Sequence, residues 1–206
     1  MTEFEHRGVG PRVDATAVVA PTAAVVGDVE IGRGTRIGYG VVITAESGPV
    51  RIGADVIVMD NAVLRGTARH PLHLGDRVLV GPLSSLSGCS VADDVFVATG
   101  ASVFNGAVIG PGAEVRIGGI VHLCTRLEPG AVVPIGWVAV GDPALIAPPD
   151  RHDEIWAHQR PLDFPGEVFG VDRPADGEHL LATVAPRYAA ALGRWHRDDR
   201  PLGGGG

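Results

Sequence analysis

Residues able to do chemistry gather around Arg65 and the segment that follows it. Directly after Arg65 comes an eight-residue insertion, GTARHPLH, which carries His70 and His73. A guanidinium can orient a carboxylate through two parallel hydrogen bonds, and a neutral imidazole can bind a metal ion or move a proton. Loops also carry function more often than core segments do. These residue types predict a small-molecule site or a metal site, provided that the fold brings them together.

The stretch VGPLSSLSGC, residues 80–89, offers weaker chemistry. Pro82 has no donor atom on its side chain, and the hydroxyl groups of Ser85 and Ser87 are poor zinc ligands. Both hydroxyls can still form a hydrogen bond to a substrate. We therefore count Ser85 and Ser87 as substrate-binding candidates, together with Arg65, His70 and His73.

The elements that must position these residues follow from a repeat of aliphatic side chains. The spacing is six residues, broken by two insertions and one five-residue step. The positions are Val13, Val19, Val25, Ile31, Ile37, Ile43, Ile52, Val58, Leu64, Leu74, Val80, Leu86, Val91, Val97, Val103, Ile109, Val115, Val121, Leu127 and Val133. A helix has a period of 3.6 and a lone strand a period of two, so neither explains the pattern.

A period of six is typical of a solenoid with short straight faces, each of which points one aliphatic residue inward. Three faces require 18 residues per coil, so the repeat predicts about seven triangular coils of a parallel β-helix. The spacing alone does not determine the handedness. We predict a lead-in over residues 1–12, the β-helix over 13–144, a connector and helices packed on the solenoid over 145–200, and a disordered tail over 201–206.

Composition limits the function classes. The 206 residues carry a net charge of −7 and no run of Lys or Arg, which argues against nucleic-acid and anionic-membrane partners. The cysteines, Cys89 and Cys124, lack the spacing of a zinc ribbon or a disulfide framework. No signal peptide and no long apolar segment stands out, so we expect a cytoplasmic protein.

Several motifs resemble those of a known family. The period-six repeat and the exit stretch VGDPALIAPP are similar to the hexapeptide-repeat superfamily. Within it, MDNAVLRG and VGPLSSLSGC resemble two motifs of the γ-class carbonic anhydrases, and the likeness runs from about Val13 to Ala144. This resemblance implies a left-handed β-helix and a homotrimer.

The zinc ligands of that family are missing from the matching positions. In the family, three histidines bind zinc across a subunit interface, and here Arg65, Pro82 and Ser87 stand in their places. A catalytic zinc needs about three protein ligands and an open position. We therefore expect a metal-free site without a cofactor, and no hydration of carbon dioxide.

The resemblance also places two carboxylates near Arg65. Asp60 matches a family Asp, and Glu46 stands where the family has another Asp, so Glu46, Asp60 and Arg65 are the catalytic candidates. They would bind or convert a small anionic or carbonyl-bearing molecule by acid–base chemistry. Alternatively, Arg65 only forms a structural ion pair with Asp60 or Glu46.

Other functions remain open. A metal site could have been rebuilt from His70, His73 or His122. The chain could be an inactive assembly subunit. It could also be a transferase that takes acyl groups from coenzyme A, as sister branches of the superfamily do, with a histidine supplied by the TARHPLH loop.

Overall fold

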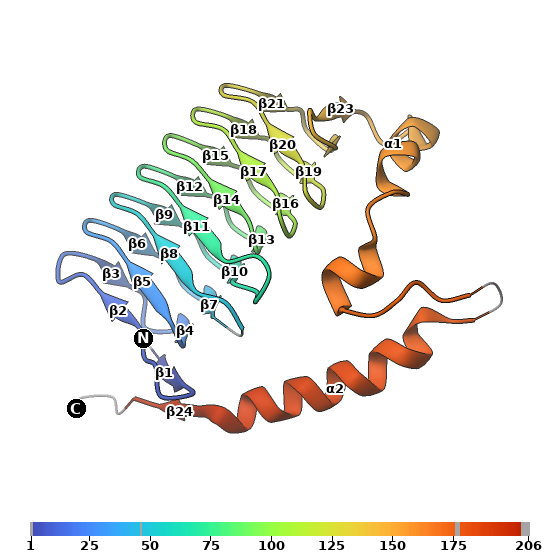
Figure 1. Ribbon diagram of the computed structural model, residues 1–206. Coiled ribbons are helices and arrows are strands. Elements are labelled where there is room, and N and C mark those ends of the chain that lie inside the picture. The colour runs from blue at the N-terminus through green and yellow to red at the C-terminus, as the bar shows by residue number, and fades with distance from the viewer. Residues whose placement is uncertain (1, 46, 176–177, 203–206) are drawn as a thin grey trace.

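The protein is a triangular parallel β-helix followed by a helical extension (Figure 1). The computed structural model describes residues 2–45, 47–175 and 178–202. Within these residues the strands form three sheets, which we call A, B and C. From β1 to β21, successive strands belong to sheets A, B and C in turn. Strands β1, β2 and β3 therefore form one coil, and β19, β20 and β21 form the seventh of the described coils. The predicted β-helix is confirmed.

The strands are short because each covers only one face of a coil. Sheet A contains β1 (Thr2–His6), β4 (Ala24–Val26), β7 (Val42–Thr44), β10 (Val63–Arg65), β13 (Ser85–Ser87), β16 (Ser102–Val103), β19 (Ile120–Val121), β22 (Val138–Val140), β23 (Leu145–Ala147) and β24 (Asp199–Pro201). Sheet B contains β2 (Arg12–Val13), β5 (Val29–Ile31), β8 (Val50–Ile52), β11 (Leu72–Leu74), β14 (Ser90–Val91), β17 (Val108–Ile109) and β20 (Arg126–Leu127). Sheet C contains β3 (Val18–Val19), β6 (Arg36–Ile37), β9 (Ile57–Val58), β12 (Leu79–Val80), β15 (Phe96–Val97), β18 (Glu114–Val115) and β21 (Val132–Val133).

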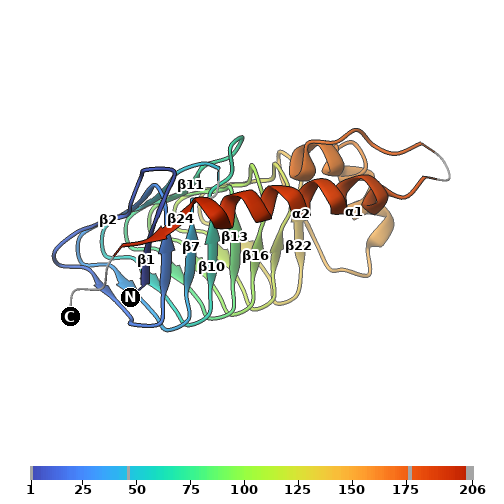
Figure 2. The same ribbon diagram turned by 90° about the horizontal axis from the view of Figure 1, so that it is seen from below.

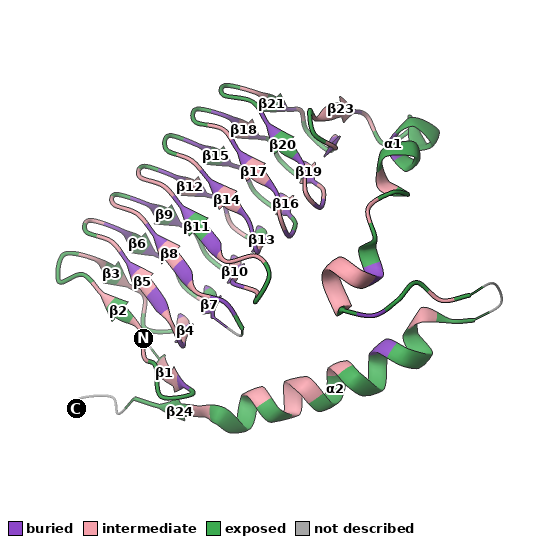
Figure 3. Cartoon of the chain, viewed as in Figure 1, coloured by how far each residue is buried: buried purple, intermediate pink, exposed green. Residues whose placement is uncertain are grey.

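The period-six aliphatic residues form the core of the solenoid. On sheet A the strand register aligns Val25, Ile43, Leu64, Leu86 and Val103 in one column. Sheets B and C align their own members of the series in the same way. Most of these side chains are buried (Figure 3). Burying one aliphatic residue per face stabilises each coil against its neighbours and fixes the register, because a slip by one residue would turn these side chains outward.

Both ends of the solenoid are closed by strands of sheet A. At the start, β1 pairs in parallel with β4, so residues placed in the predicted lead-in form part of the sheet. The other edge of β1 pairs with β24, an antiparallel strand from the far end of the chain. At the last coil, β23 folds back antiparallel to β22. Covered edges protect a sheet from pairing with another chain. Residues 203–206 of the predicted tail lie outside the described residues.

The extension runs back along the solenoid over sheet A. It contains helix α1 (His152–Gln159), the π-helix η1 (Pro165–Phe169) and helix α2 (Leu180–Asp198). Figure 2 shows α2 crossing sheet A from the last coil to the first. Pro186 lies inside α2, which continues through it as one helix. No helix of the described part of the chain is long and apolar enough to cross a membrane.

Candidate functional site

Three adjacent strands of sheet A bring polar side chains into one row. Thr44 on β7, Arg65 on β10 and Ser87 on β13 are direct register partners. Leu64 and Leu86 point into the core, and because side chains alternate along a strand, Arg65 and Ser87 point out of the solenoid. The repeat therefore places two of the predicted site residues next to each other on the outer surface of sheet A.

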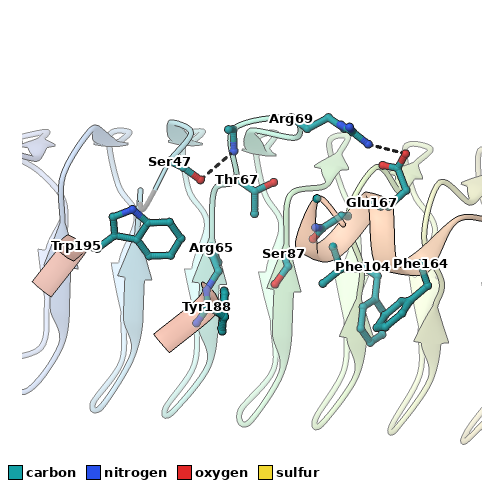
Figure 4. A pocket seen from close by; sticks show the side chains of 15 residues that line it. Ser47, Arg65, Thr67, Arg69, Ser87, Phe104, Phe164, Glu167, Tyr188 and Trp195 are labelled. Carbon is teal, nitrogen blue, oxygen red and sulfur yellow. Dashed lines mark hydrogen bonds and ion pairs between the residues drawn. The ribbon is translucent and has the colours of Figure 1, made fainter. Parts of the chain in front are cut away.

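A cavity of about 380 Å³ lies over this row, between sheet A and the extension; we call it the Arg65 pocket (Figure 4). Its floor and one side come from the coils and its other side from η1 and α2. The lining residues are Ser47, Arg65, Thr67, Ala68, Arg69, Ser87, Phe104, Asn105, Phe164, Gly166, Glu167, Val168, Gly170, Tyr188 and Trp195. Arg65 also lines a smaller cavity of about 210 Å³ together with Thr44 and Trp195. The volume of the Arg65 pocket is in the range of small-molecule sites.

The inserted loop after β10 forms one wall of the Arg65 pocket. The loop is closed by the backbone N–H and the hydroxyl of Thr67, which donate to the carbonyl of His70 at 2.9 and 3.0 Å. This turn presents Arg69 to Glu167 on η1, where Nη1 donates to Oε1 at 2.8 Å. Nε2 of His70 lies 3.2 Å from Oε2 of the same carboxylate. The hydrogen bond with His70 is the main cause that lowers the pKa of Glu167 from its ordinary value, and the hydrogen bond with Arg69 lowers it further.

Aromatic rings connect the two helical segments that cover the pocket. Phe164 packs edge-on against Phe169 with ring centres 5.6 Å apart, Phe169 against Tyr188 at 6.0 Å, and Tyr188 against Trp195 at 6.4 Å. Edge-to-face pairs of this kind each contribute about 0.5–1.5 kcal/mol beyond the burial of their area. This series of rings fixes η1 to α2 and gives the Arg65 pocket an aromatic side opposite the strands.

The structure does not bring all the predicted site residues to the pocket. Asp60 is exposed at a corner, where its Oδ1 accepts a hydrogen bond of 2.7 Å from the backbone N–H of Tyr39. Neither of the two cavities that Arg65 lines has Asp60 among its described lining residues. His73 is exposed on sheet B, and Ser85 lies at the other end of β13 from Ser87. Glu46 lies outside the described residues.

Pro82 and Ser87 lie in different parts of the coil. Pro82 is in the corner that precedes β13, and Ser87 is the last residue of β13, beside Arg65. Of the three positions that the resemblance matches to family histidines, Arg65 and Ser87 therefore form a pair within one chain, and Pro82 stands apart. This arrangement is compatible with a site that a second chain would complete.

His122 follows β19 and lies in a different environment. Its ring is 5.9 Å from the ring of Phe104, and it lines a cavity of about 620 Å³ with Trp156, Arg160 and other residues of the extension. Burial lowers the pKa of His122, and among the described residues its Nδ1 has no hydrogen-bond partner. This second cavity is larger than the Arg65 pocket, but it lacks the row of polar side chains from adjacent coils.

Sequence reasoning missed several residues that line the Arg65 pocket. Arg69 belongs to the inserted loop, whose length was the signal that could have identified it. Glu167, Tyr188 and Trp195 come from the extension, and they reach the pocket only because α2 runs back over sheet A. No local pattern in the sequence indicates that return path.

The fold is that of a parallel β-helix protein, similar to the hexapeptide-repeat proteins. No protein family model matches the chain. Gamma carbonic anhydrase 1, mitochondrial, of Arabidopsis thaliana is 37% identical over 128 residues, which cover 59% of this chain and 46% of that protein. A carbonic anhydrase of Geobacillus kaustophilus is 31% identical over 109 residues, 53% of this chain and 60% of that protein.

A solved structure extends the similarity to the fold. A Bacillus cereus protein inferred to be an acetyltransferase aligns with a TM-score of 0.53 and 26% identity, over 76% of this chain and 90% of that chain. The chain spans about half the length of the Arabidopsis relatives it matches. It is thus a γ-class carbonic anhydrase-like left-handed β-helix protein, as the motifs suggested, and its activity must be argued from its own site.

Proposed function

We propose that the chain acts as a homotrimer that binds a small anionic or carbonyl-bearing molecule in the Arg65 pocket and does not hydrate carbon dioxide. One observation carries this proposal. Arg65 and Ser87, which the resemblance matches to two family histidines, are neighbours on β10 and β13 and both line a cavity of about 380 Å³. On this proposal the family site persists as a cavity, in which a cation and a hydroxyl group stand where the family has imidazoles.

The lining of the pocket suits such a ligand. Arg65 supplies a fixed positive charge with donors that match a carboxylate, and Ser87 beside it can donate one further hydrogen bond. The rings of Tyr188 and Trp195 supply apolar contact from the extension. A few placed polar groups among apolar ones are typical of small-molecule sites. We propose a ligand with one carboxylate or carbonyl group and a small carbon skeleton.

Conversion of the ligand would need a group that moves protons. Asp60 is a weaker candidate than the sequence indicated, because its carboxylate accepts a hydrogen bond from Tyr39 at a corner. The resemblance named Glu46 as the other carboxylate, so we propose Glu46 as the acid–base residue. Glu46→Gln should then abolish turnover while ligand binding persists. Equal turnover in that variant would exclude this role.

A zinc site of the family type is not supported by these residues. None of Arg65, Pro82 and Ser87 offers an imidazole. We expect stopped-flow assays of carbon dioxide hydration by the chelator-treated protein to give the rate of buffer alone. Hydration well above background that is lost in Ser87→Ala would contradict the proposal.

The homotrimer is proposed because Pro82 lies in the corner before β13, whereas Arg65 and Ser87 end the paired strands β10 and β13. A neighbouring chain that docks its Pro82 corner beside the Arg65 pocket would restore the arrangement found across the family interface. Multi-angle light scattering at micromolar concentration should give three times the mass of one chain. A clean monomer would contradict this part of the proposal.

Melting of Arg65→Ala distinguishes binding from a structural ion pair. If Arg65 binds a ligand, the variant should be a folded trimer whose melting temperature is close to that of the parent protein. A structural ion pair predicts a large loss, because removal of one partner of a buried pair costs about 3–5 kcal/mol. Asp60 is exposed at a corner, so the double-mutant cycle combines Arg65→Ala with Glu46→Gln, and strong coupling between the two changes would refute the binding role.

Acyl transfer is a second candidate, which the similarity to the Bacillus cereus structure favours. The inserted loop supplies His70, whose ring contacts Glu167. A carboxylate that holds an imidazole is a common arrangement for a general base. Calorimetric titration with coenzyme A is the test: binding at micromolar concentration would favour acyl transfer, and its absence would leave the anion site as the better account.

A further inference from the structure

Three metal-binding side chains meet at the edge of the Arg65 pocket. His70 comes from the inserted loop, Cys124 from the corner after β19, and Glu167 from η1 in the extension. One donor atom from each lies within 4.8 Å of the other two. Glu167 lines the Arg65 pocket, so the cluster borders the proposed binding site without including any of the positions that match the family histidines.

The donor types and their separations fit zinc. Zinc is bound by imidazole nitrogen and carboxylate oxygen at about 2.0–2.2 Å and by thiolate sulfur at about 2.3 Å, so donors at tetrahedral angles lie roughly 3.3–3.6 Å apart. The observed distance between Nε2 of His70 and Oε2 of Glu167 is 3.2 Å. The upper limit of 4.8 Å for the cluster requires only small side-chain rotations to reach zinc-binding distances.

The backbone at Gly106 lies close to both the imidazole and the thiol. Gly106, in the preceding coil, has no side chain there. A Cβ atom at this position would lie 2.9 Å from Sγ of Cys124 and 3.1 Å from Cε1 of His70. Any larger residue at position 106 would therefore press on both ligands. Glycine at position 106 therefore keeps a side chain away from the two ligands.

Cys124 adopts a backbone conformation that is unusual for its residue type. Its φ is +52°, in the left-handed region, and the equivalent corner one coil earlier is Gly106 with a φ of +75°. Of the six other non-glycine residues with positive φ in the described part of the chain, three are Asp or Asn, which tolerate the conformation, and three are Arg7, Arg77 and Leu83. The conformation costs stability at a cysteine, and a functional role of the side chain would account for its presence.

Neighbouring contacts hold the other two ligands in place. The turn closed by Thr67 fixes the His70 backbone, and the loop packs directly on Gly88, where an added Cβ would lie 2.8 Å from the Cβ of His70. Arg69 holds Oε1 of Glu167, while Oε2 faces the imidazole. Groups that orient metal ligands in this way typically change metal affinity 10–100-fold when they are removed.

We propose that His70, Cys124 and Glu167 form a three-ligand site for Zn²⁺, with a fourth position open to water or to a ligand from the Arg65 pocket. The ion would join three segments that are distant in sequence and would fix η1 against the coils. Of the histidines considered as parts of a rebuilt metal site, this proposal uses only His70, and it adds two ligands that the sequence did not reveal. It does not depend on the proposed anion binding.

Titration of the chelator-treated, untagged full chain with zinc chloride tests the site. Calorimetry should show one ion per chain, and Co²⁺ in place of Zn²⁺ should give a thiolate-to-cobalt charge-transfer band. Cys124→Gly should remove the band and weaken zinc binding at least about 100-fold, since losing a ligand should cost no less than losing an orienting group. Glycine suits the left-handed backbone at this position, so this variant should fold at least as well as the parent. Glu167→Gln should weaken binding similarly.

Two variants serve as controls. His73→Ala removes an exposed histidine of the same insertion and should keep the parent affinity. Arg65→Ala should also keep it, so loss of anion binding and loss of zinc binding are separate outcomes. The proposal is overturned if the parent binds no zinc, if Cys124→Gly binds it as the parent does, or if His73→Ala loses as much affinity as Cys124→Gly.

Discussion

The coils and the extension are held by different kinds of interaction. In the coils, aliphatic side chains repeat in register, and Ile43, Leu64 and Leu86 are each fully buried. In the extension, helix α2 exposes most of its side chains, with Val184 as its one buried residue among those described (Figure 3). The coils are stabilised by burial repeated at every turn, whereas the extension is attached by a few specific contacts.

Those contacts are concentrated at three places. At the first coil, β24 pairs with β1, and His6 Nδ1 lies 2.7 Å from Asp199 Oδ1. At the last coil, α1 buries Ile155 in a small cluster with residues of β22 and β23. Between them, Glu167 contacts the inserted loop. The comparison indicates a rigid scaffold with a covering segment whose position depends on single side chains, and the candidate site lies between the two.

Truncation of a core side chain should have the largest effect. Leu86→Ala leaves a cavity in a fully packed column and should lower the free energy of unfolding by about 2–5 kcal/mol. Leu181→Ala, in α2, changes a side chain that is 66% exposed and should have little effect. Denaturation with guanidinium measures both. Similar losses in the two variants would contradict the contrast between the regions.

Weakening the aromatic series should loosen the extension alone. Tyr188 packs against Phe169 and Trp195, so Tyr188→Ala should cost about 1 kcal/mol for each lost ring contact. Hydrogen exchange should become faster in residues 180–198 and stay unchanged in the coils. Tyr188→Phe keeps the ring and serves as the matched control; equal exchange in the two variants would show that the rings do not hold α2.

Acid should produce the smallest effect, at the first coils. The pKa of Asp28 is lowered from its ordinary value, chiefly because Arg51 Nη2 donates a hydrogen bond of 2.9 Å to its carboxylate. This contribution to stability is present above the ordinary carboxyl pKa and is lost as the pH falls through the lowered value. Since Asp28 is partly exposed, the loss should be small.

Melting curves measured over a range of acidic pH values test this expectation. Asp28→Asn should remove part of the acid dependence, whereas Asp153→Asn, at a fully exposed position in α1, should leave the curve unchanged. An unchanged acid dependence in Asp28→Asn would show that the interaction with Arg51 does not stabilise the coils.

The fold of the coils could be predicted because a single period fixes it. Every six-residue step marks one inward side chain, and register follows when those side chains stack. The period does not predict the role of a corner side chain: the resemblance made Asp60 a candidate for acid–base chemistry, and the structure shows its carboxylate accepting a backbone hydrogen bond. Glu167 could not be placed from the sequence at all, because its partners His70 and Arg69 lie about a hundred residues earlier in the chain.

A crystal structure of the protein soaked with malonate tests the central claim most directly, because it shows the ligand, the subunits and any metal together. We predict a trimer in which a malonate carboxylate contacts the guanidinium of Arg65 and the hydroxyl of Ser87, with no metal ion between positions 65, 82 and 87. A metal ion bound at those positions, or an Arg65 pocket without malonate in a structure of the trimer, would contradict the account.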